Sequence, residues 1–186
     1  MEKKVLEVLK RRRAIYPENF NDDKITPEEV KELLEVMRFA PTHRLTEPWR
    51  IHVFMNEEKT KLAHFLRDKI DEAAGKPGKG DRTVEKFERA QAILAVGYQK
   101  DEKERVPEWE ELAATSMAVQ NFWIYTRAKG MGGYLSTGQS TIDGVTEYLD
   151  LSDDWVVMGI FYLGKTSHVP RERPAKTVDE FTKWHI

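Results

Sequence analysis

The segment from Pro107 to Lys129 places the strongest constraint on how this chain can fold. It has helical spacing with no internal proline or glycine, and Gly130 follows it as a helix-ending residue. A helix with apolar residues on nearly every side must be buried, so this segment is predicted to lie inside a domain or at a subunit interface. Its apolar residues are Leu112, Ala113, Ala114, Met117, Ala118, Val119, Phe122, Trp123, Ile124 and Tyr125.

Shorter elements follow from the period of the apolar residues. The clearest begins at Thr26, a cap residue followed by Pro27 and by Glu29, which completes a Thr-x-x-Glu capping box. Helices are predicted over 1–13, 27–40, 57–73 and 142–149, with a last helix opening at Thr177. Strands are predicted over 49–55, 92–97 and 155–163, with a tight glycine loop at 130–133 and a short extended piece at 134–136.

The order of these elements predicts the fold class. Helices and strands do not alternate regularly, which is unlike a parallel βαβ arrangement and typical of an α+β fold. With 186 residues, the chain is predicted to form a single domain over 1–186. In that domain, helices pack around a small mixed β-sheet and the long helix is buried at the centre.

Composition excludes several classes of function. The chain has no cysteine, which excludes disulfides, thiolate zinc sites, iron–sulfur clusters and a cysteine nucleophile. Its net charge of -2 gives no global reason to bind nucleic acid, and no apolar run approaches a membrane span. The five histidines lack metal-binding helix spacing, so no metal site is expected. The N-terminus lacks a signal-peptide core, so a cytoplasmic protein is expected.

One motif match has a structural explanation. The segment Gly159 to Thr166 matches the pattern G-x-x-x-x-G-K-[ST] of a phosphate-binding loop. Its four inner residues are large and apolar and continue the strand predicted from Trp155, and Pro170 follows too soon for a helix to begin there. We therefore interpret the segment as a core strand, and we reject a nucleotide hydrolase.

Two other features leave structural and functional interpretations open. The glycines at 130–133 can end a helix and form a turn, or they can let backbone approach a flat ligand. Arg11, Arg12 and Arg13 can be the solvated end of a helix, or they can hold a phosphate by paired hydrogen bonds. A second basic pair, Arg171 and Arg173, is compatible with one dianion bridging the two clusters.

Taken in order, four segments resemble the nitroreductase family of FMN-dependent oxidoreductases. Residues 11–15 resemble its Arg-Arg-Ser-x-Arg signature, and residues 39–49 resemble its Ala-Pro-Ser…Gln-Pro-Trp segment. Residues 118–122 followed by 130–138 resemble its Gln-Asn-Leu…Gly-Leu-Gly-x-x-x-x-Gly run. Residues 157–164 followed by 171–174 resemble its closing strand and basic loop. The match extends over nearly the whole chain and is similar to a compact, minimal subgroup of the family.

The resemblance implies a homodimer with FMN at the interface and NAD(P)H as the reductant. It also implies which residues contact the cofactor. Arg11, Arg12 and Arg13, with Arg173 and Arg171, would hold the phosphate, and His43 would lie against the flavin. Leu135, Ser136 and Thr137 would meet the flavin or its ribityl chain.

The activity implied is hydride transfer from NAD(P)H through flavin N5 to an electron-poor acceptor, such as a nitro-compound, quinone or conjugated alkene. No catalytic side chain is identified, because the flavin carries the chemistry. The alternative is a module that binds, stores or senses FMN without turnover. Leu45 and Glu47 stand where the family often has Asn and Gln, so the carboxylate of Glu47, if close to the flavin, is expected to disfavour its reduction.

Overall fold

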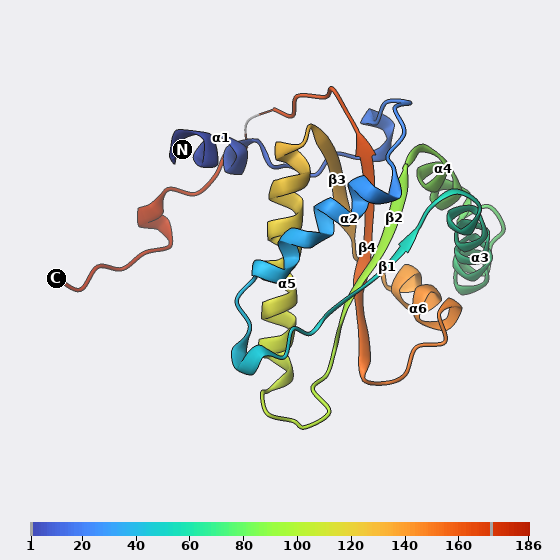
Figure 1. The fold of residues 1–186 in the computed structure, drawn as a ribbon. Coiled ribbons are helices and arrows are strands. Elements are labelled where there is room, and N and C mark those ends of the chain that lie inside the picture. The colour runs from blue at the N-terminus through green and yellow to red at the C-terminus, as the bar shows by residue number, and fades with distance from the viewer. Residues whose placement is uncertain (1, 172) are drawn as a thin grey trace.

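A four-stranded sheet forms the centre of the computed structural model, which describes residues 2–171 and 173–186 (Figure 1). Its strands are β1 (Trp49–Phe54), β2 (Ala92–Gln99), β3 (Met131–Ser136) and β4 (Trp155–Lys165). They lie in the order β1-β2-β4-β3, and every neighbouring pair is antiparallel. The prediction of a mixed sheet is therefore wrong. Strand β4 enters between β2 and β3 and runs opposite to both, so these two parallel strands never touch.

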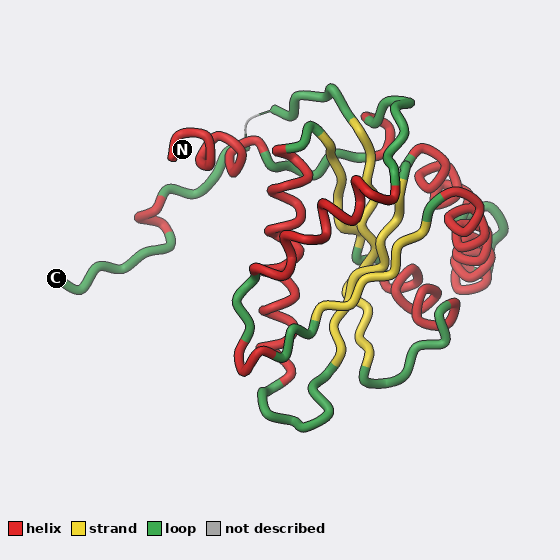
Figure 2. Tube along the Cα trace, viewed as in Figure 1, coloured by secondary structure: helices red, strands yellow, loops and turns green. Residues whose placement is uncertain are grey.

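Helices cover both faces of the sheet (Figure 2). The helices α2 (Pro27–Glu35) and α5 (Glu108–Ala128) pack on one face, and α3 (Asn56–Ala74), α4 (Asp81–Arg89) and α6 (Gln139–Tyr148) pack on the other. The first core lies between the sheet and the α2 and α5 helices, and the second core lies on the opposite face. Leu94 and Val96 of β2 belong to the first core, and Ile93 and Ala95 belong to the second. Because both faces are covered, β2 is apolar at successive positions, and the predicted α+β fold is confirmed.

The element boundaries show where local signals were sufficient. The Thr26–Glu29 capping box forms, with Glu29 N donating to Thr26 Oγ1 at 3.2 Å and Thr26 N donating to the Glu29 carboxylate at 2.8 Å. The helix it opens ends at Glu35 and tightens into a 3₁₀ turn over Val36–Phe39, before Pro41. The first helix, α1 (Glu2–Arg11), stops before Arg13, and residue 1 of the predicted helix lies outside the described residues.

Two other elements differ from the sequence prediction. The helix α4 was not predicted, because it carries a single buried apolar residue, Phe87, among mostly charged ones. The helix predicted at Thr177 is only a 3₁₀ turn over Val178–Glu180, although its capping box forms. Phe181 and Trp184 beyond it are each 68% exposed, so no buried face stabilises further helical turns.

The glycine loop predicted at 130–133 is also wrong. Only Gly130 forms a turn, with φ of 77°, and Gly132 and Gly133 lie within β3. A Cβ on Gly133 would stand 2.1 Å from the carbonyl oxygen of Tyr162 and 2.3 Å from the ring of Phe161. Close packing inside the sheet therefore explains this glycine. The strand interpretation of residues 159–165 is confirmed, because they lie within β4.

The long helix α5 is buried on one side and uncovered on the other. Ala118, Val119 and Phe122 pack into the first core, whereas Trp109 is 66% exposed and Met117 is 41% exposed. Burial of the whole helix, as predicted, therefore needs a further surface. Within 2–171 and 173–186, no helix is both long enough and apolar enough to cross a bilayer.

Candidate cofactor site

Three of the predicted phosphate-binding arginines lie near enough for their charges to interact. Arg12 and Arg13 follow α1, and Arg173 comes from the distant C-terminal segment. The pKa of the Arg12 guanidinium is lowered by burial and, secondarily, by the positive charges of Arg13 and Arg173. Like charges held close to one another favour the binding of an anion between them. The structure thus brings Arg173, from the C-terminal basic pair, toward Arg12 and Arg13 of the N-terminal cluster.

Arg12 has an unused donor within this cluster. Its guanidinium carbon lies 4.6 Å from the ring centroid of Trp123 on α5, a cation–π arrangement. Its Nε is buried and has no hydrogen-bond partner among the described residues. A buried donor left unpaired costs about 1–3 kcal/mol. A phosphate oxygen would satisfy such a donor, so the residues present fit the phosphate of FMN.

The other two predicted arginines are placed differently. The guanidinium of Arg11 pairs with Glu7 on α1 at 2.7 Å, and its charge lowers the pKa of Arg127, whose burial is the larger cause. The side chain of Arg11 therefore lies toward the C-terminal end of α5 and not toward the guanidinium of Arg12. Arg171 is exposed in the C-terminal segment.

The predicted residues after the glycines lie at the end of β3. Leu135 packs against the first core, Ser136 pairs with Ile160 of β4, and Thr137 is exposed just beyond the strand. The segment that follows Arg13 runs beside this strand, because Ile15 N donates to Gly133 O at 3.1 Å. The arginine-bearing segment and β3 are thereby fixed to each other.

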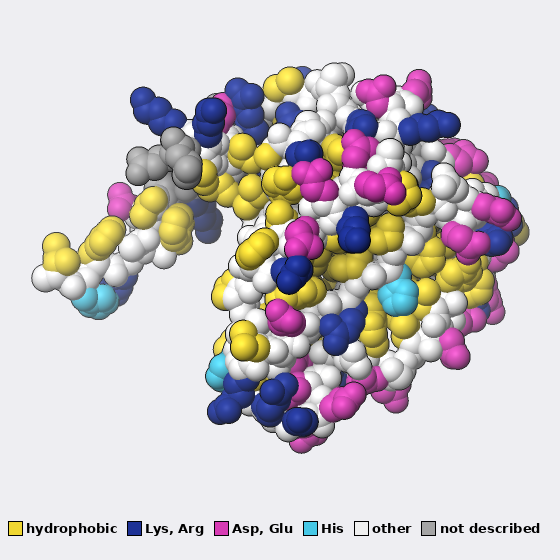
Figure 3. Space-filling model, viewed as in Figure 1, with side chains coloured by type: hydrophobic (Ala, Val, Ile, Leu, Met, Phe, Trp, Pro, Cys, Tyr) yellow, Lys and Arg dark blue, Asp and Glu magenta, His cyan; other side chains and the backbone are white. Residues whose placement is uncertain are grey.

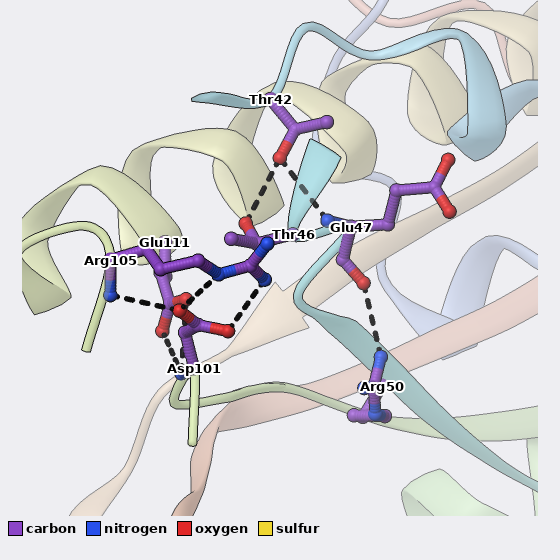
Figure 4. Close-up of polar contacts among 7 residues, drawn as sticks. All are labelled: Thr42, Thr46, Glu47, Arg50, Asp101, Arg105 and Glu111. Carbon is purple, nitrogen blue, oxygen red and sulfur yellow. Dashed lines mark hydrogen bonds and ion pairs between the residues drawn. The ribbon is translucent and has the colours of Figure 1, made fainter. Parts of the chain in front are cut away.

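His43 belongs to a turn over residues 42–47, the His43 turn, whose backbone is unusual. Figure 4 shows Thr42, Thr46 and Glu47 of this turn. Arg44, Leu45 and Glu47 have φ values of 51°, 54° and 43°, the left-handed region that non-glycine residues rarely occupy. Thr42 and Thr46 share a hydrogen bond of 3.1 Å between their hydroxyls, and Glu47 N donates to Thr42 Oγ1 at 3.2 Å. Strained backbone of this kind costs about 1–3 kcal/mol per residue and is concentrated at functional sites.

Two side chains from other elements hold the same turn. Arg50 of β1 donates from Nη1 to Glu47 O at 3.1 Å, and Nδ1 of His43 lies 2.5 Å from Oε2 of Glu110 on α5. Glu110 precedes Trp123 by thirteen residues of α5, or about 20 Å at 1.5 Å per residue. A single chain therefore places His43 and the Arg12 cluster near opposite ends of one helix.

The first turn of α5 carries three carboxylates with three different partners, which the sequence analysis missed. Besides Glu110, Glu108 accepts a 2.7 Å hydrogen bond from Tyr98, and Glu111 accepts from the backbone N–H of Asp101 at 3.1 Å. Burial raises the pKa of Glu111, although the Asp101 N–H bond opposes this. No sequence motif marks these contacts, because the partners come from β2 and the loop after it.

A cavity of about 250 Å³ lies between this loop and the His43 turn. Its lining includes Thr46, Arg50, Arg105 and Glu111 (Figure 4). Arg105 donates to both carboxylate oxygens of Asp101, at 2.8 and 2.7 Å. Those hydrogen bonds are the main reason that the pKa of Asp101 falls from 3.8 to about 2. In the part of the chain that the structure describes, no cluster of three or more His, Asp or Glu side chains could hold a metal ion.

Asp101→Asn is expected to reduce the dependence of stability on acid pH. A carboxyl with a depressed folded-state pKa contributes stability above about pH 4, and this contribution is lost as the pH falls toward 2. The variant should therefore unfold more easily than the wild type at neutral pH, and the difference should shrink between pH 4 and pH 2. Urea unfolding at several pH values measures this. Asp153→Asn, an exposed change of the same charge, is the control, and an equal effect of both variants would contradict the prediction.

Comparison with known proteins places the chain in a family. A sequence model described as "Nitroreductase family" matches residues 9–165. "Putative NAD(P)H nitroreductase YfhC" of Bacillus subtilis is 29% identical over 187 residues, covering 95% of this chain and 92% of that protein.

Solved structures share the fold. A nitroreductase-like family protein from Bacillus cereus has a TM-score of 0.83 at 23% identity, covering 97% of this chain and 95% of that one. A structure from Desulfovibrio desulfuricans in complex with FMN has a TM-score of 0.76 at 18% identity, covering 98% and 97%. The resemblance inferred from the motifs is confirmed, and the chain belongs to the nitroreductase family.

Proposed function

We propose that this protein is an FMN-dependent oxidoreductase that transfers hydride from NAD(P)H to an electron-poor organic acceptor, such as a nitro-compound, quinone or conjugated alkene. The observation that carries the proposal is the group formed by Arg12, Arg13 and Arg173, with the buried and unpaired Nε of Arg12. Family membership supports an oxidoreductase with this cofactor.

The residues of the chain would bind and orient the cofactor. Arg12, Arg13 and Arg173 would hold its phosphate, with Arg11 and Arg171 at the margins. The end of β3 at 135–137 would contact the ribityl chain or ring, and His43 would lie against the ring. When bound, the flavin supplies the hydride acceptor and donor, so the protein contributes position and electrostatics rather than an acid or base.

The site requires a second copy of the chain. His43 and the Arg12 cluster lie about 20 Å apart along α5, at a rise of 1.5 Å per residue. A two-fold axis perpendicular to α5 would bring the His43 end of one copy beside the arginine end of the other. Such an isologous contact uses the same surface twice. We therefore propose a homodimer with FMN at the interface.

The uncovered apolar surface supports this assembly. Apolar side chains gather where α5 meets α1 and along the C-terminal segment (Figure 3). Both terminal segments extend away from the body (Figure 1). Apolar side chains that gather on an exposed face are typical of a surface that binds a partner. The exposed residues are Val5, Leu6 and Leu9 of α1, Trp109, Leu112 and Met117 of α5, and Val178, Phe181 and Trp184 of the C-terminal segment.

The proposed activity is tested by the released cofactor and by turnover. The purified protein, reconstituted where necessary, should release FMN on denaturation, identified by its mass. The loaded protein should oxidise NADH or NADPH in steady state when a nitro-compound or quinone is supplied. FAD, or no flavin under any condition, would contradict the cofactor assignment. Bound FMN without acceptor-dependent turnover would leave the non-catalytic alternative.

Removing Arg12 or Arg173 is expected to weaken FMN binding by roughly ten- to a hundredfold. Each would lose a charge-assisted hydrogen bond worth about 1.5–3 kcal/mol. Arg12→Lys should recover only part of the affinity, because lysine lacks the planar fork. The two losses should be non-additive, since both residues would hold one phosphate. Fluorescence titration of FMN measures these effects, with Arg82→Ala on α4 as a control of equal charge. Unchanged affinity in both single variants would place the phosphate elsewhere.

Met117→Glu is expected to separate the proposed dimer, because it puts a charge into the centre of the apolar face of α5. Sedimentation velocity at micromolar concentration should show a dimer for the wild type and a monomer for the variant. FMN affinity should fall with the dimer, since each copy would supply part of the site. Ala73→Glu adds the same charge to exposed α3, on the other face of the sheet, and should remain dimeric. A wild type that is monomeric when loaded with FMN would refute the shared site.

A further inference from the structure

The backbone of the His43 turn, residues 42–47, is strained. Three of the six residues at 42–47 adopt left-handed backbone without being glycine. Such a backbone persists only when the surroundings fix it. The bonds of Thr42 to Thr46 and to Glu47 lie within the turn and move with it. Contacts from other elements must therefore set its position, and they include the hydrogen bonds from Arg50 to Glu47 and between Glu110 and His43.

Glu110 is the fixed member of its pair. It lies in the first turn of α5, and its helix neighbours Glu111, Ala114 and Thr115 are buried. A carboxylate is favoured there because the helix dipole is positive at that end. The side chain of Glu110 is 23% exposed, whereas that of His43 is 57% exposed. The carboxylate of Glu110 is therefore the less exposed member of the pair, and the ring of His43 is the more exposed one.

We infer that Glu110 is a positioning residue for His43. Its Oε2 lies 2.5 Å from Nδ1, so the proton on that nitrogen is held in the hydrogen bond, and Nε2 is left as the nitrogen on the other side of the ring. The tautomer and the direction of the ring are then set before any ligand arrives. Preorganisation of this kind lowers the entropy lost on binding.

This inference rests on the proposed function, in which His43 lies against the flavin. With Nδ1 engaged by Glu110, only Nε2 can form a hydrogen bond with the cofactor. A neutral ring offers an acceptor at Nε2, and a doubly protonated ring offers a donor at the same place. In either state Glu110 determines which atom is presented and where. Glu110 itself touches neither cofactor nor substrate in this arrangement, so it acts through His43.

The first test reads the imidazole directly and needs no cofactor. Nitrogen-15 NMR of histidine-labelled protein, with His43 assigned by His43→Gln, reports which ring nitrogen carries the proton. In the wild type, Nδ1 of His43 should be protonated, and Glu110→Ala should shift this signal toward that of an exposed histidine. Glu57→Ala, which removes an exposed carboxylate from the first turn of α3, should leave the signal unchanged. A bare Nδ1 in the wild type would overturn the inference.

The second test asks whether Glu110 acts through His43. Glu110→Ala should weaken FMN binding about three- to tenfold, the scale of a pairwise coupling. In a His43→Gln background the same change should alter the affinity less than twofold. Equal losses in both backgrounds would overturn the positioning role while leaving FMN binding intact. A wild type that binds no flavin would refute the proposed function and the role of Glu110 within it, whatever the NMR signal shows.

Discussion

The packing of α5 on the sheet is the interaction on which the rest of the molecule depends. Phe122 and Trp123 both meet the ring of Phe161 edge-on, with centroids 5.1 and 5.2 Å apart. These contacts fix a helix of 21 residues against the central strand β4. Both halves of the candidate site are attached to that helix, because Arg12 lies over Trp123 and His43 is held by Glu110. Rigid packing in the core therefore sets the spacing of polar groups at the surface.

The charges around α5 follow the polarity of the helix. Its first turn carries Glu108, Glu110 and Glu111, and its last turn carries Arg127, each sign favoured at that end by the dipole. The three carboxylates form hydrogen bonds with partners in the His43 turn, in β2 and in the loop after β2. The guanidiniums of Arg13 and Arg173 repel that of Arg12. This repulsion adds to the larger effect of burial in lowering the pKa of Arg12. The carboxylates at the start of α5 therefore have partners, whereas the arginines near its other end are suited to an anion.

Local signals in the sequence predicted much of the fold, and they failed where distant contacts decide the outcome. The capping box at Thr26 and the apolar run of β2 depend on neighbouring residues, so they could be read directly. The glycines at 132 and 133 look like a loop until Ile15, Phe161 and Tyr162 are packed against them. The arginines and His43 were named through motifs, but the partner carboxylate of Glu110 could not be, because 67 residues separate it from His43.

Two costs in the structure lie where the family motifs lie. The buried Nε of Arg12 lacks a partner, and the turn after His43 holds three strained residues. Neither feature stabilises the folded chain, and each could be removed by an ordinary substitution, such as leucine for Arg12 or glycine for Leu45. Marginal stability leaves little room for costs of this size without compensation. A ligand that accepts a hydrogen bond from Arg12 and contacts the His43 turn of a second copy would recover part of both. These two costs are therefore consistent with the proposal that both halves belong to one site completed by association.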